Sequence, residues 1–319
     1  MNNVKTIISL KKLGKLISFK PLEKNSNRNF FVETTKGKFV FSFYTDGPRY
    51  RTLSELKAQQ ELSDYLLQKK FPIAKIISVF KLKDEKTNVL IREYISGSSK
   101  STPTKSEVSQ FAKLFGRFHK LTQNFKTKNK FAHRWDLKTT IQHVNGLQRK
   151  FSKDKFLLRI QSELKNIRIV NNLPSGTIHE DLGRRHVLWD KNKITGFIDF
   201  ERSYYAPLVY DLGQTIRGWC FHSDWQKWCN KKLTNLLKCY STQRKITVDE
   251  KKYLFDAIKF AVIERALSFY IKYLYHKDKS ARDYALHSLN YLLPLLEKKK
   301  NKIQTIINPS VRERRGSAA

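Results

Sequence analysis

One stretch of the sequence, residues 176–202, constrains the fold more than any other; it reads GTIHEDLGRRHVLWDKNKITGFIDFER. Two short apolar runs, VLW at 187–189 and ITGFIDF at 194–200, flank the polar tetrapeptide DKNK. This pattern predicts two antiparallel strands joined by a polar turn. Pairing across the turn would set position 186 close to position 198 or 199. We therefore expect Asp181 and Asp199 to converge at one end of the hairpin.

These two carboxylates lie beside a histidine and two arginines, a costly grouping unless a cation or a reaction requires it. Phosphoryl transfer has that requirement, because one carboxylate orients the attacking hydroxyl and another holds Mg²⁺ against the nucleotide phosphates. The alternative is an ordinary polar loop in which Arg184 and Arg185 neutralise the acids. The residues by themselves leave both interpretations open.

The first 97 residues predict a small lobe made of an antiparallel sheet and one helix. Strand-like apolar runs recur in this region, at residues 15–22, 29–35, 39–45, 74–80 and 88–95. A capping box at Thr52–Glu55 begins a helix that ends at Phe71-Pro72. Residues 1–20 are basic and partly amphipathic, and we expect them to pack against this lobe; the alternative is a membrane-surface or organelle-targeting helix.

Residues 98–106, SSKSTPTKS, have the composition of a linker between two lobes. Residues 107–305 then predict a larger, mainly helical lobe that contains the hairpin. Helical patterns begin after a capping box at Thr104–Glu107 and recur at 138–171, 224–240, 249–276 and 280–304, the last with a kink at Pro294. Residues 306–319 are expected to be a disordered tail. The predicted fold class is therefore α+β, with two lobes.

The charge of the chain is strongly positive: 63 Lys and Arg against 28 Asp and Glu give a net charge of +35. Such a surface attracts polyanions, although a solvated basic face explains the composition equally well.

Three cysteines at spacings that match no zinc or redox motif favour reduced thiols and a cytoplasmic protein. No apolar run approaches the ~20 residues needed to span a bilayer, so no transmembrane segment is expected. Isolated histidines, His119 among them, are interpreted as surface or core residues rather than ligands.

The motif HxD at 179–181, followed 18 residues after its Asp by IDF, resembles the catalytic loop and metal-binding segment of the aminoglycoside phosphotransferase and choline kinase superfamily, relatives of protein kinases. Within it, the chain is most similar to the type II homoserine kinases. Further shared motifs follow in the same order, NSNRNFFVETTKGKFVFSF at 25–43, FGRFH at 115–119 and YDLGQTIRGWC at 210–220. The resemblance covers about residues 12–275 and implies a bilobal, protein-kinase-like fold.

The resemblance also implies roles for individual residues. Asp181 matches the base that positions the substrate hydroxyl, and His179 matches the residue that braces the loop. Arg185 is placed with them as a catalytic residue. Asp199 matches the Mg²⁺ ligand, and Asp211 matches the acid that tethers the catalytic loop.

ATP and Mg²⁺ are the cofactors that the resemblance implies, with residues 1–97 as the nucleotide-binding lobe. The residues implied for the nucleotide are Asn25, Ser26 and Asn27 in a turn over the phosphates, Ser42 on a strand, Glu61 on the first helix, and Glu93, Tyr94 and Ile95 beside the adenine.

Two positions depart from the family pattern. His186 stands five residues after Asp181, where the family normally has an Asn that binds the second metal. A neutral imidazole suits Mn²⁺ better than Mg²⁺. Either the metal preference has moved, or the second metal is held more weakly, or His186 contacts the substrate. Ser42 occupies the position of the Lys that holds the nucleotide phosphates in most kinases; a nearby cation such as Arg51 is one replacement.

Arginines outnumber acids around the expected site, which disfavours a polycationic acceptor and favours one with a carboxylate or phosphate. Homoserine and acidic sugars fit that description, with Arg202, Arg217 and Glu201 as candidate substrate residues. Alternatively, the arginines neutralise the phosphates of ATP. The leading hypothesis is an ATP-dependent kinase of a small-molecule hydroxyl. The other is a catalytically weakened kinase-like protein that acts as a nucleotide sensor or as a module binding RNA or acidic lipid.

Overall fold

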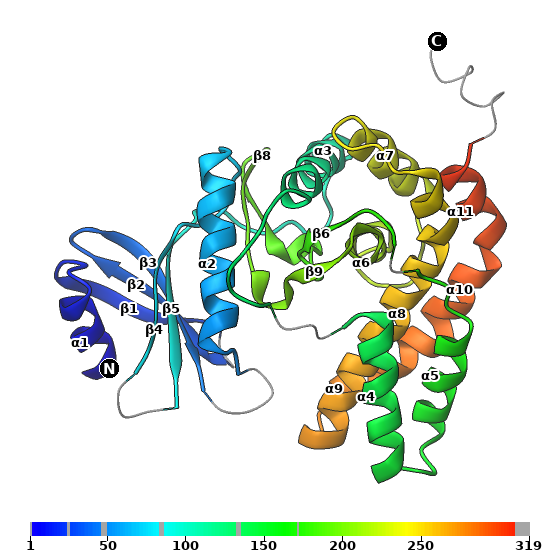
Figure 1. The fold of residues 1–319 in the computed structure, drawn as a ribbon, viewed down its shortest axis with the longest axis horizontal. Coiled ribbons are helices and arrows are strands. Elements are labelled where there is room, and N and C mark those ends of the chain that lie inside the picture. The colour runs from blue at the N-terminus through cyan, green and yellow to red at the C-terminus, as the bar shows by residue number, and fades with distance from the viewer. Residues whose placement is uncertain are drawn as a thin grey trace. The chain divides into compact units, whose positions relative to one another are not determined.

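The computed structural model describes residues 2–23, 26–45, 50–82, 86–131, 135–170 and 172–309 (Figure 1). The chain divides into two compact units. The first comprises Met1–Ser98, Phe125–Phe131 and Val187–Ile198, and the second comprises Ser99–Asn124, Ala132–His186 and Asp199–Ala319. The predicted α+β class is confirmed, since the first unit holds an antiparallel sheet and the second is mainly helical.

The boundary between Ser98 and Ser99 lies in the stretch predicted as a linker. Two stretches that the sequence analysis assigned to the second lobe, residues 125–131 and 187–198, belong instead to the first unit. The stretch predicted as a tail starts inside the last helix, which ends at Ile307, and its residues 310–319 lie outside the described part of the chain.

Five strands in the first unit form an antiparallel sheet with the order β1-β2-β3-β5-β4 (Figure 1). They are β1 (Leu16–Glu23), β2 (Ser26–Thr34), β3 (Gly37–Tyr44), β4 (Ile76–Lys81) and β5 (Asn88–Glu93), accompanied by the helices α1 (Asn2–Leu10) and α2 (Leu53–Gln68). Each strand coincides with one of the predicted apolar runs. Gly37 follows the turn between β2 and β3 with a φ of 148°, a conformation that side chains rarely adopt.

Both helices of the first unit pack as their sequences predict. Val4, Ile7 and Ile8 of α1 are buried in one cluster with apolar residues of the sheet, which confirms the expected packing of the amphipathic N-terminus. At the start of α2, the Thr52 side chain accepts the Glu55 N–H at 3.2 Å, and the Glu55 carboxylate accepts the Thr52 N–H at 2.8 Å. This is the predicted capping box.

The second unit is built around a long buried helix, α8, which contacts α5, α6, α9, α10 and α11 (Figure 1). Its helices are α3 (Lys105–Thr122), α4 (Leu137–Lys150), α5 (Lys155–Lys165), α6 (Leu208–Cys220), α7 (Asn230–Ser241), α8 (Val248–His276), α9 (Lys279–His287), α10 (Leu293–Lys298) and α11 (Lys300–Ile307). Two short strands, β6 (Ser175–Ile178) and β9 (Tyr204–Pro207), pair beside α6.

Three predicted helices are interrupted or shorter. The stretch 138–171 breaks after α4, and Asp154 caps a separate α5. The helix expected from residue 224 begins only at Asn230, because a turn at Trp225 precedes it. The stretch 280–304 contains a π-helical turn, Ser288–Leu292, and Pro294 lies in the first turn of the new helix α10 instead of kinking a continuous one.

The hairpin predicted in residues 187–200 is present as β7 (Val187–Asp190) and β8 (Lys193–Phe197), with Val187 paired with Phe197. The second strand ends three residues earlier than predicted. The reason is the backbone of Asp199, which has a φ of 67° and leads into a 3₁₀ turn at Phe200–Arg202.

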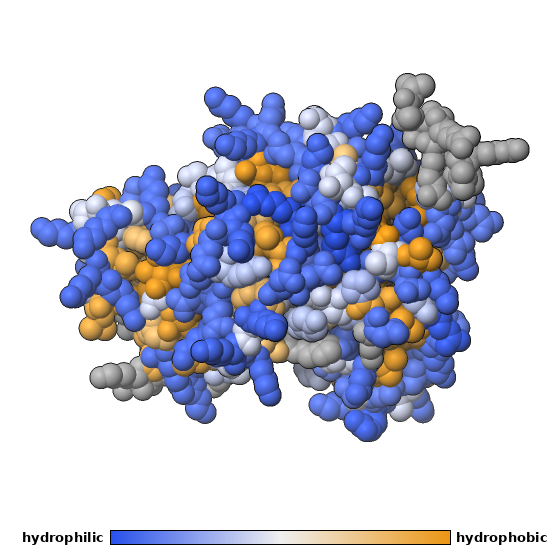
Figure 2. All heavy atoms as spheres, turned by 45° about the horizontal axis from the view of Figure 1, so that its top comes forward, coloured by the Kyte–Doolittle hydropathy of each residue, from blue (hydrophilic) through white to orange (hydrophobic). Residues whose placement is uncertain are grey.

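Hydrophilic side chains dominate the face of the molecule seen in Figure 2, with smaller apolar areas between them. This agrees with the excess of Lys and Arg in the sequence. Within the described ranges, no helix combines the length and apolar character that crossing a membrane requires.

Candidate active site

The loop that follows β6 is held by one carboxylate, that of Asp211 in α6, which is fully buried. Its Oδ2 accepts the backbone N–H of His179 at 2.8 Å, and its Oδ1 accepts the N–H of Glu180 at 2.9 Å. Glu180 has a φ of 66°, which is unfavourable for a residue with a side chain. The two hydrogen bonds that Asp211 accepts, from His179 and from Glu180 itself, stabilise the turn that presents Asp181.

Asp211 is itself positioned by a buried chain of polar side chains. The Nε2 of His119 lies 3.0 Å from Asp211 Oδ2, and its Nδ1 lies 2.7 Å from the Tyr240 hydroxyl. Arg244 donates to that hydroxyl at 2.9 Å and to Glu250 at 2.6 Å. Burial lowers the pKa of His119 although Asp211 opposes the shift, so the imidazole is neutral and donates from Nε2. The interpretation of His119 as a core residue is confirmed, and the FGRFH motif is the signal that marks its wider role.

Asp181 is ionised and held between two guanidinium groups. One carboxylate oxygen is bonded to Arg265 of α8, and the other lies 3.2 Å from Arg185. Burial by itself raises the pKa of Asp181, but the charges of Arg265 and Arg185 outweigh it and hold the pKa well below its usual range. Sequence reasoning missed Arg265; the signal was a charged pair inside the apolar run AVIERALSF.

His186 brings the two predicted acids together, because it contacts both. Its Nδ1 bonds to the backbone carbonyl of Asp181 and lies 3.9 Å from the Asp181 carboxylate. Its Nε2 lies 3.2 Å from Oδ2 of Asp199, whose side chain is 43% exposed. With the proton assigned to Nδ1, the Nε2 lone pair accepts from Arg185 Nε at 3.0 Å and faces a carboxylate oxygen.

Two electron-rich atoms side by side, one imidazole nitrogen and one carboxylate oxygen, form an arrangement that a divalent cation stabilises. Within the described part of the chain, no group of three or more His, Cys, Asp and Glu side chains could hold a metal by itself. The pair of His186 and Asp199 therefore fits a divalent metal whose remaining ligands are water or phosphate oxygens, and the imidazole favours Mn²⁺ over Mg²⁺.

A second polar cluster lies beneath the loop. Glu180 and Glu264 are both fully buried, and Arg202 lies 2.7 Å from Glu264 and 3.6 Å from Glu180. Gln214 donates to Glu264 at 2.7 Å and to Glu180 at 3.3 Å. Burial raises the pKa of Glu180 well above its usual range, against the opposing charge of Arg202. The charge of Arg202 is thus already compensated by Glu264, with Glu180 as a second, more distant partner.

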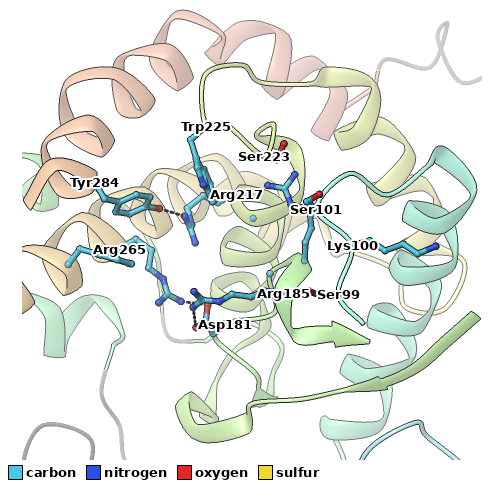
Figure 3. Close-up of a pocket in the computed structure, with 14 residues that line it drawn as sticks. Ser99, Lys100, Ser101, Asp181, Arg185, Arg217, Ser223, Trp225, Arg265 and Tyr284 are labelled. Carbon is cyan, nitrogen blue, oxygen red and sulfur yellow. Dashed lines mark hydrogen bonds and ion pairs between the residues drawn. The ribbon is translucent and has the colours of Figure 1, made fainter. Parts of the chain in front are cut away.

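Next to Asp181 the second unit contains a pocket of about 490 Å³, and Figure 3 shows the side chains that line it. It is lined by Ser99, Lys100, Ser101, Asp181, Gly183, Arg184, Arg185, Arg217, Gly218, Ser223, Trp225, Arg265, Phe269 and Tyr284. Of the three predicted substrate residues, Arg217 is among these, whereas Arg202 and Glu201 are not. Five of the lining side chains are cationic and one is acidic, which gives the pocket a strongly positive character.

Of the residues implied for the nucleotide, Asn25 lies outside the described residues, and Ser26 and Asn27 are described only as backbone of β2. Ser42 donates to Asn29 Oδ1 at 2.6 Å and accepts from Arg92 at 3.3 Å. Arg92 of β5 is therefore a cation in contact with Ser42. Arg51, suggested for this place by the sequence, has its guanidinium on the carbonyl of Tyr50 at 3.0 Å.

Glu61 of α2 binds the segment Phe125–Phe131 of the same unit. Its carboxylate accepts from the Thr127 hydroxyl, from the Lys128 N–H at 3.1 Å and from the Asn129 amide at 2.7 Å. Glu93, Tyr94 and Ile95 lie at the end of β5 and just beyond it. The N–H groups of Glu93 and Tyr94 donate to the carbonyls of Lys75 and Lys38, each at 2.9 Å.

Comparison with known proteins gives one family match and many relatives. Residues 18–228, more than half of the chain, match the model of the phosphotransferase enzyme family called APH. A homoserine kinase of Neisseria meningitidis is 24% identical over 256 residues, which cover 76% of this chain and 79% of that protein. A homoserine kinase of Methylobacillus flagellatus is 24% identical over 220 residues, or 66% of each chain.

Solved structures give the same result for the fold. A choline kinase from Streptococcus pneumoniae, LicA, superimposes with a TM-score of 0.65 at 14% identity and covers 93% of this chain and 98% of its own. The amicoumacin kinase hAmiN, solved in complex with AMP-PNP, Ca²⁺ and Ami, has a TM-score of 0.65 at 13% identity. The match covers 95% of this chain and 94% of hAmiN. The expected protein-kinase-like fold is confirmed, and with it the resemblance inferred from the motifs. The chain belongs to the APH phosphotransferase enzyme family.

Proposed function

We propose that this protein is an ATP-dependent kinase that phosphorylates a hydroxyl group of a small molecule with a carboxylate or a phosphate. The observation that carries the proposal is the ionised Asp181, anchored through Asp211, with the His186–Asp199 pair directly beside it. Phosphoryl transfer needs this combination of an acceptor-orienting carboxylate and a cation-binding pair.

Each side chain has a role in this proposal. Asp181 orients the acceptor hydroxyl and receives its proton, while Arg185 and Arg265 keep Asp181 ionised. His179 and Asp211 brace the loop. Asp199 and His186 would hold a divalent metal, Mg²⁺ or Mn²⁺, which would neutralise charge on the nucleotide phosphates.

The reaction transfers one phosphoryl group. The acceptor oxygen forms a bond to the γ-phosphorus, the bond from that phosphorus to the β–γ bridging oxygen breaks, and ADP leaves. The acceptor proton passes to Asp181 and then to solvent. Because the pKa of Asp181 is low, it is a weak base, which suits a mainly dissociative transition state in which the proton moves late.

For the nucleotide we propose the first unit, with residues 25–27, Ser42, Glu61 and the segment 93–95 in the places that the family pattern implies. The hydrogen bond between Arg92 and Ser42 supports one revision. Arg92 replaces the phosphate-binding Lys that most kinases have at the Ser42 position, since its guanidinium donates to the Ser42 hydroxyl.

The acceptor is homoserine, whose carboxylate is its anionic group, or an anionic metabolite or sugar. Homoserine is the substrate in the names of the relatives, at about a quarter identity. The cationic lining of the pocket supports the anionic character.

The test is phosphate transfer by the purified full-length chain from labelled ATP, with Mg²⁺ or Mn²⁺, to a panel containing homoserine, sugar phosphates and choline. Asp181→Asn should lower kcat about 10²–10⁴-fold. Asp283→Asn, which neutralises an exposed acid on α9, is the control and should leave kcat unchanged. Absence of product with every acceptor, together with ATP turnover that Asp181→Asn does not alter, contradicts the proposal.

One observation favours a second candidate, a weakened kinase that only senses the nucleotide. His186 already makes contacts with Asp181, Arg185 and Asp199, so the place of the second metal ligand is occupied by an internally bonded side chain. This candidate predicts that ATP raises the Tm without any turnover. Turnover that depends on Asp181 rejects it.

A further inference from the structure

The cations of the pocket differ in whether the protein itself neutralises them. Arg185 and Arg265 share the carboxylate of Asp181, as Figure 3 shows. Lys100 pairs with Glu107. These three cations have a counter-charge within the second unit, whereas the two that remain, Arg184 and Arg217, have neutral partners.

Arg184 and Arg217 are both buried, with exposures of 9% and 7%. Arg184 donates to the backbone carbonyls of Phe221 at 3.0 Å and His222 at 3.4 Å. Arg217 donates to Gln214 Oε1 at 3.2 Å and to the Tyr284 hydroxyl at 3.0 Å. Within the described ranges, no ion pair joins either guanidinium to a carboxylate.

Two guanidinium groups also meet at one aromatic ring. The Arg217 guanidinium lies 5.1 Å from the centre of the Trp225 ring and that of Arg184 lies 5.9 Å from it. Burial lowers the pKa of Arg184, and the charge of Arg217 adds to the shift, whereas Asp224, an exposed acid next to Trp225, opposes it. Two buried like charges that form no ion pair with a carboxylate are costly, and a bound anion lowers that cost.

The number of guanidinium groups without an ion pair indicates the charge of the anion. Two uncompensated guanidiniums match a group with two negative charges, such as a phosphate monoester or a dicarboxylate. Hydroxyls of Ser99, Ser101 and Ser223 line the same pocket and can donate to its oxygens.

The pocket is poorly suited to an ammonium group. Asp181 is the only acid in its lining, and both of its oxygens are bonded to arginines. Glu180 and Glu264 are buried beneath the loop and engaged with Arg202 and Gln214. An amino acid such as homoserine would place its ammonium among cations.

We propose that the acceptor of this kinase is a hydroxyl compound with a doubly negative group and no ammonium, whose anionic end is bound by Arg184, Arg217 and the serine hydroxyls of this pocket. This inference rests on the proposed function for the transfer step. The inference narrows the acceptor class from any anionic metabolite to dianions. In this arrangement the hydroxyl end of the acceptor faces Asp181.

The experiment measures binding to the full-length chain by titration calorimetry without nucleotide, so that no catalytic step is needed. Glycerol 3-phosphate tests a phosphate ester, malate a dicarboxylate, homoserine a zwitterion and choline a cation. At least one dianion should bind about tenfold or more tightly than homoserine, and the better of the two identifies the anionic group.

Arg217→Met should weaken binding of that dianion by about tenfold or more. Arg149→Gln removes one exposed positive charge from α4 and is the charge-matched control, expected to change binding less than twofold. If Arg217→Met does not fold, Tyr284→Phe removes only the hydroxyl that orients Arg217 and should still weaken binding by severalfold.

Equal affinity for homoserine and both dianions, or an Arg217→Met variant that folds and loses no affinity, overturns the inference. The proposed function has a separate outcome. Phosphorylation of homoserine or choline with no binding of dianions keeps the kinase and rejects the dianionic acceptor. Dianion binding that depends on Arg217, without transfer from ATP to any acceptor, supports the ligand class and rejects the kinase.

Discussion

Replacement of Asp211 by Asn tests whether one buried carboxylate organises the catalytic loop. The carboxylate accepts three hydrogen bonds, from the N–H groups of His179 and Glu180 and from Nε2 of His119. An amide of the same shape has one accepting oxygen and one donating nitrogen. Whichever way the amide is oriented, at least one donor then faces an NH₂ group in a fully buried site.

The magnitude follows from those bonds. Loss of one charge-assisted hydrogen bond costs about 1.5–3 kcal/mol, and a buried unsatisfied N–H adds about 1–3 kcal/mol. We therefore expect Asp211→Asn to lower the free energy of unfolding by about 3 kcal/mol or more. Because the freed N–H belongs to the loop that carries Asp181, kcat should fall as well, with a smaller change in KM.

The assay is urea unfolding followed by circular dichroism, together with steady-state kinetics of the phosphorylation once an acceptor is identified. Asp283→Asn is the control, since it makes the same chemical change at an exposed position of α9. A loss of stability below about 1 kcal/mol for Asp211→Asn, or an equal loss in the control, would falsify the assignment of Asp211 as the anchor of the loop.

Three further predictions follow from other parts of the second unit. Since the folded pKa of Glu180 is raised above its unfolded value of about 4.3, the folded state binds the extra proton and stability should fall as pH rises from about 4.3 towards the folded pKa. Glu180→Gln should reduce this loss of stability with rising pH. Thermal unfolding of both proteins at pH 5 and pH 8 measures the loss, and an unchanged pH dependence in the variant contradicts the prediction. His186→Asn should raise the ratio of Mg²⁺-supported to Mn²⁺-supported kcat, because an amide oxygen is the harder ligand, and a fall in that ratio rejects the metal role of His186. Gly213→Ala in α6 would place a Cβ 2.5 Å from the backbone of Ala257 in α8 and should lower the Tm by several degrees, whereas Gly146→Ala, whose nearest neighbour is 4.0 Å away, should not; equal Tm values would show that the two helices can separate at little cost.

Local patterns in the sequence were enough to predict the sheet of the first unit, two capping boxes and the hairpin β7–β8. Each depends on residues that are near neighbours along the chain, where the alternation of apolar side chains or the spacing of a cap is set by backbone geometry. The same locality placed His186 and Asp199 at one end of the hairpin, and the distance of 3.2 Å between their side chains agrees with that expectation.

Packing between distant segments decided the remaining features. Arg265 reaches Asp181 across 84 residues, and His119 reaches Asp211 across 92, and no periodicity in the chain connects either pair. Arg202 and Arg217 have the same charge in the same stretch of sequence, yet Arg202 is paired with the buried Glu264 while Arg217 lines the pocket. The sequence therefore predicted which residue types lie near the site. Which partner each charged side chain has depended on how helices α3, α6 and α8 pack around the loop. The reason is that Coulomb and hydrogen-bond energies depend on distance in space and on burial.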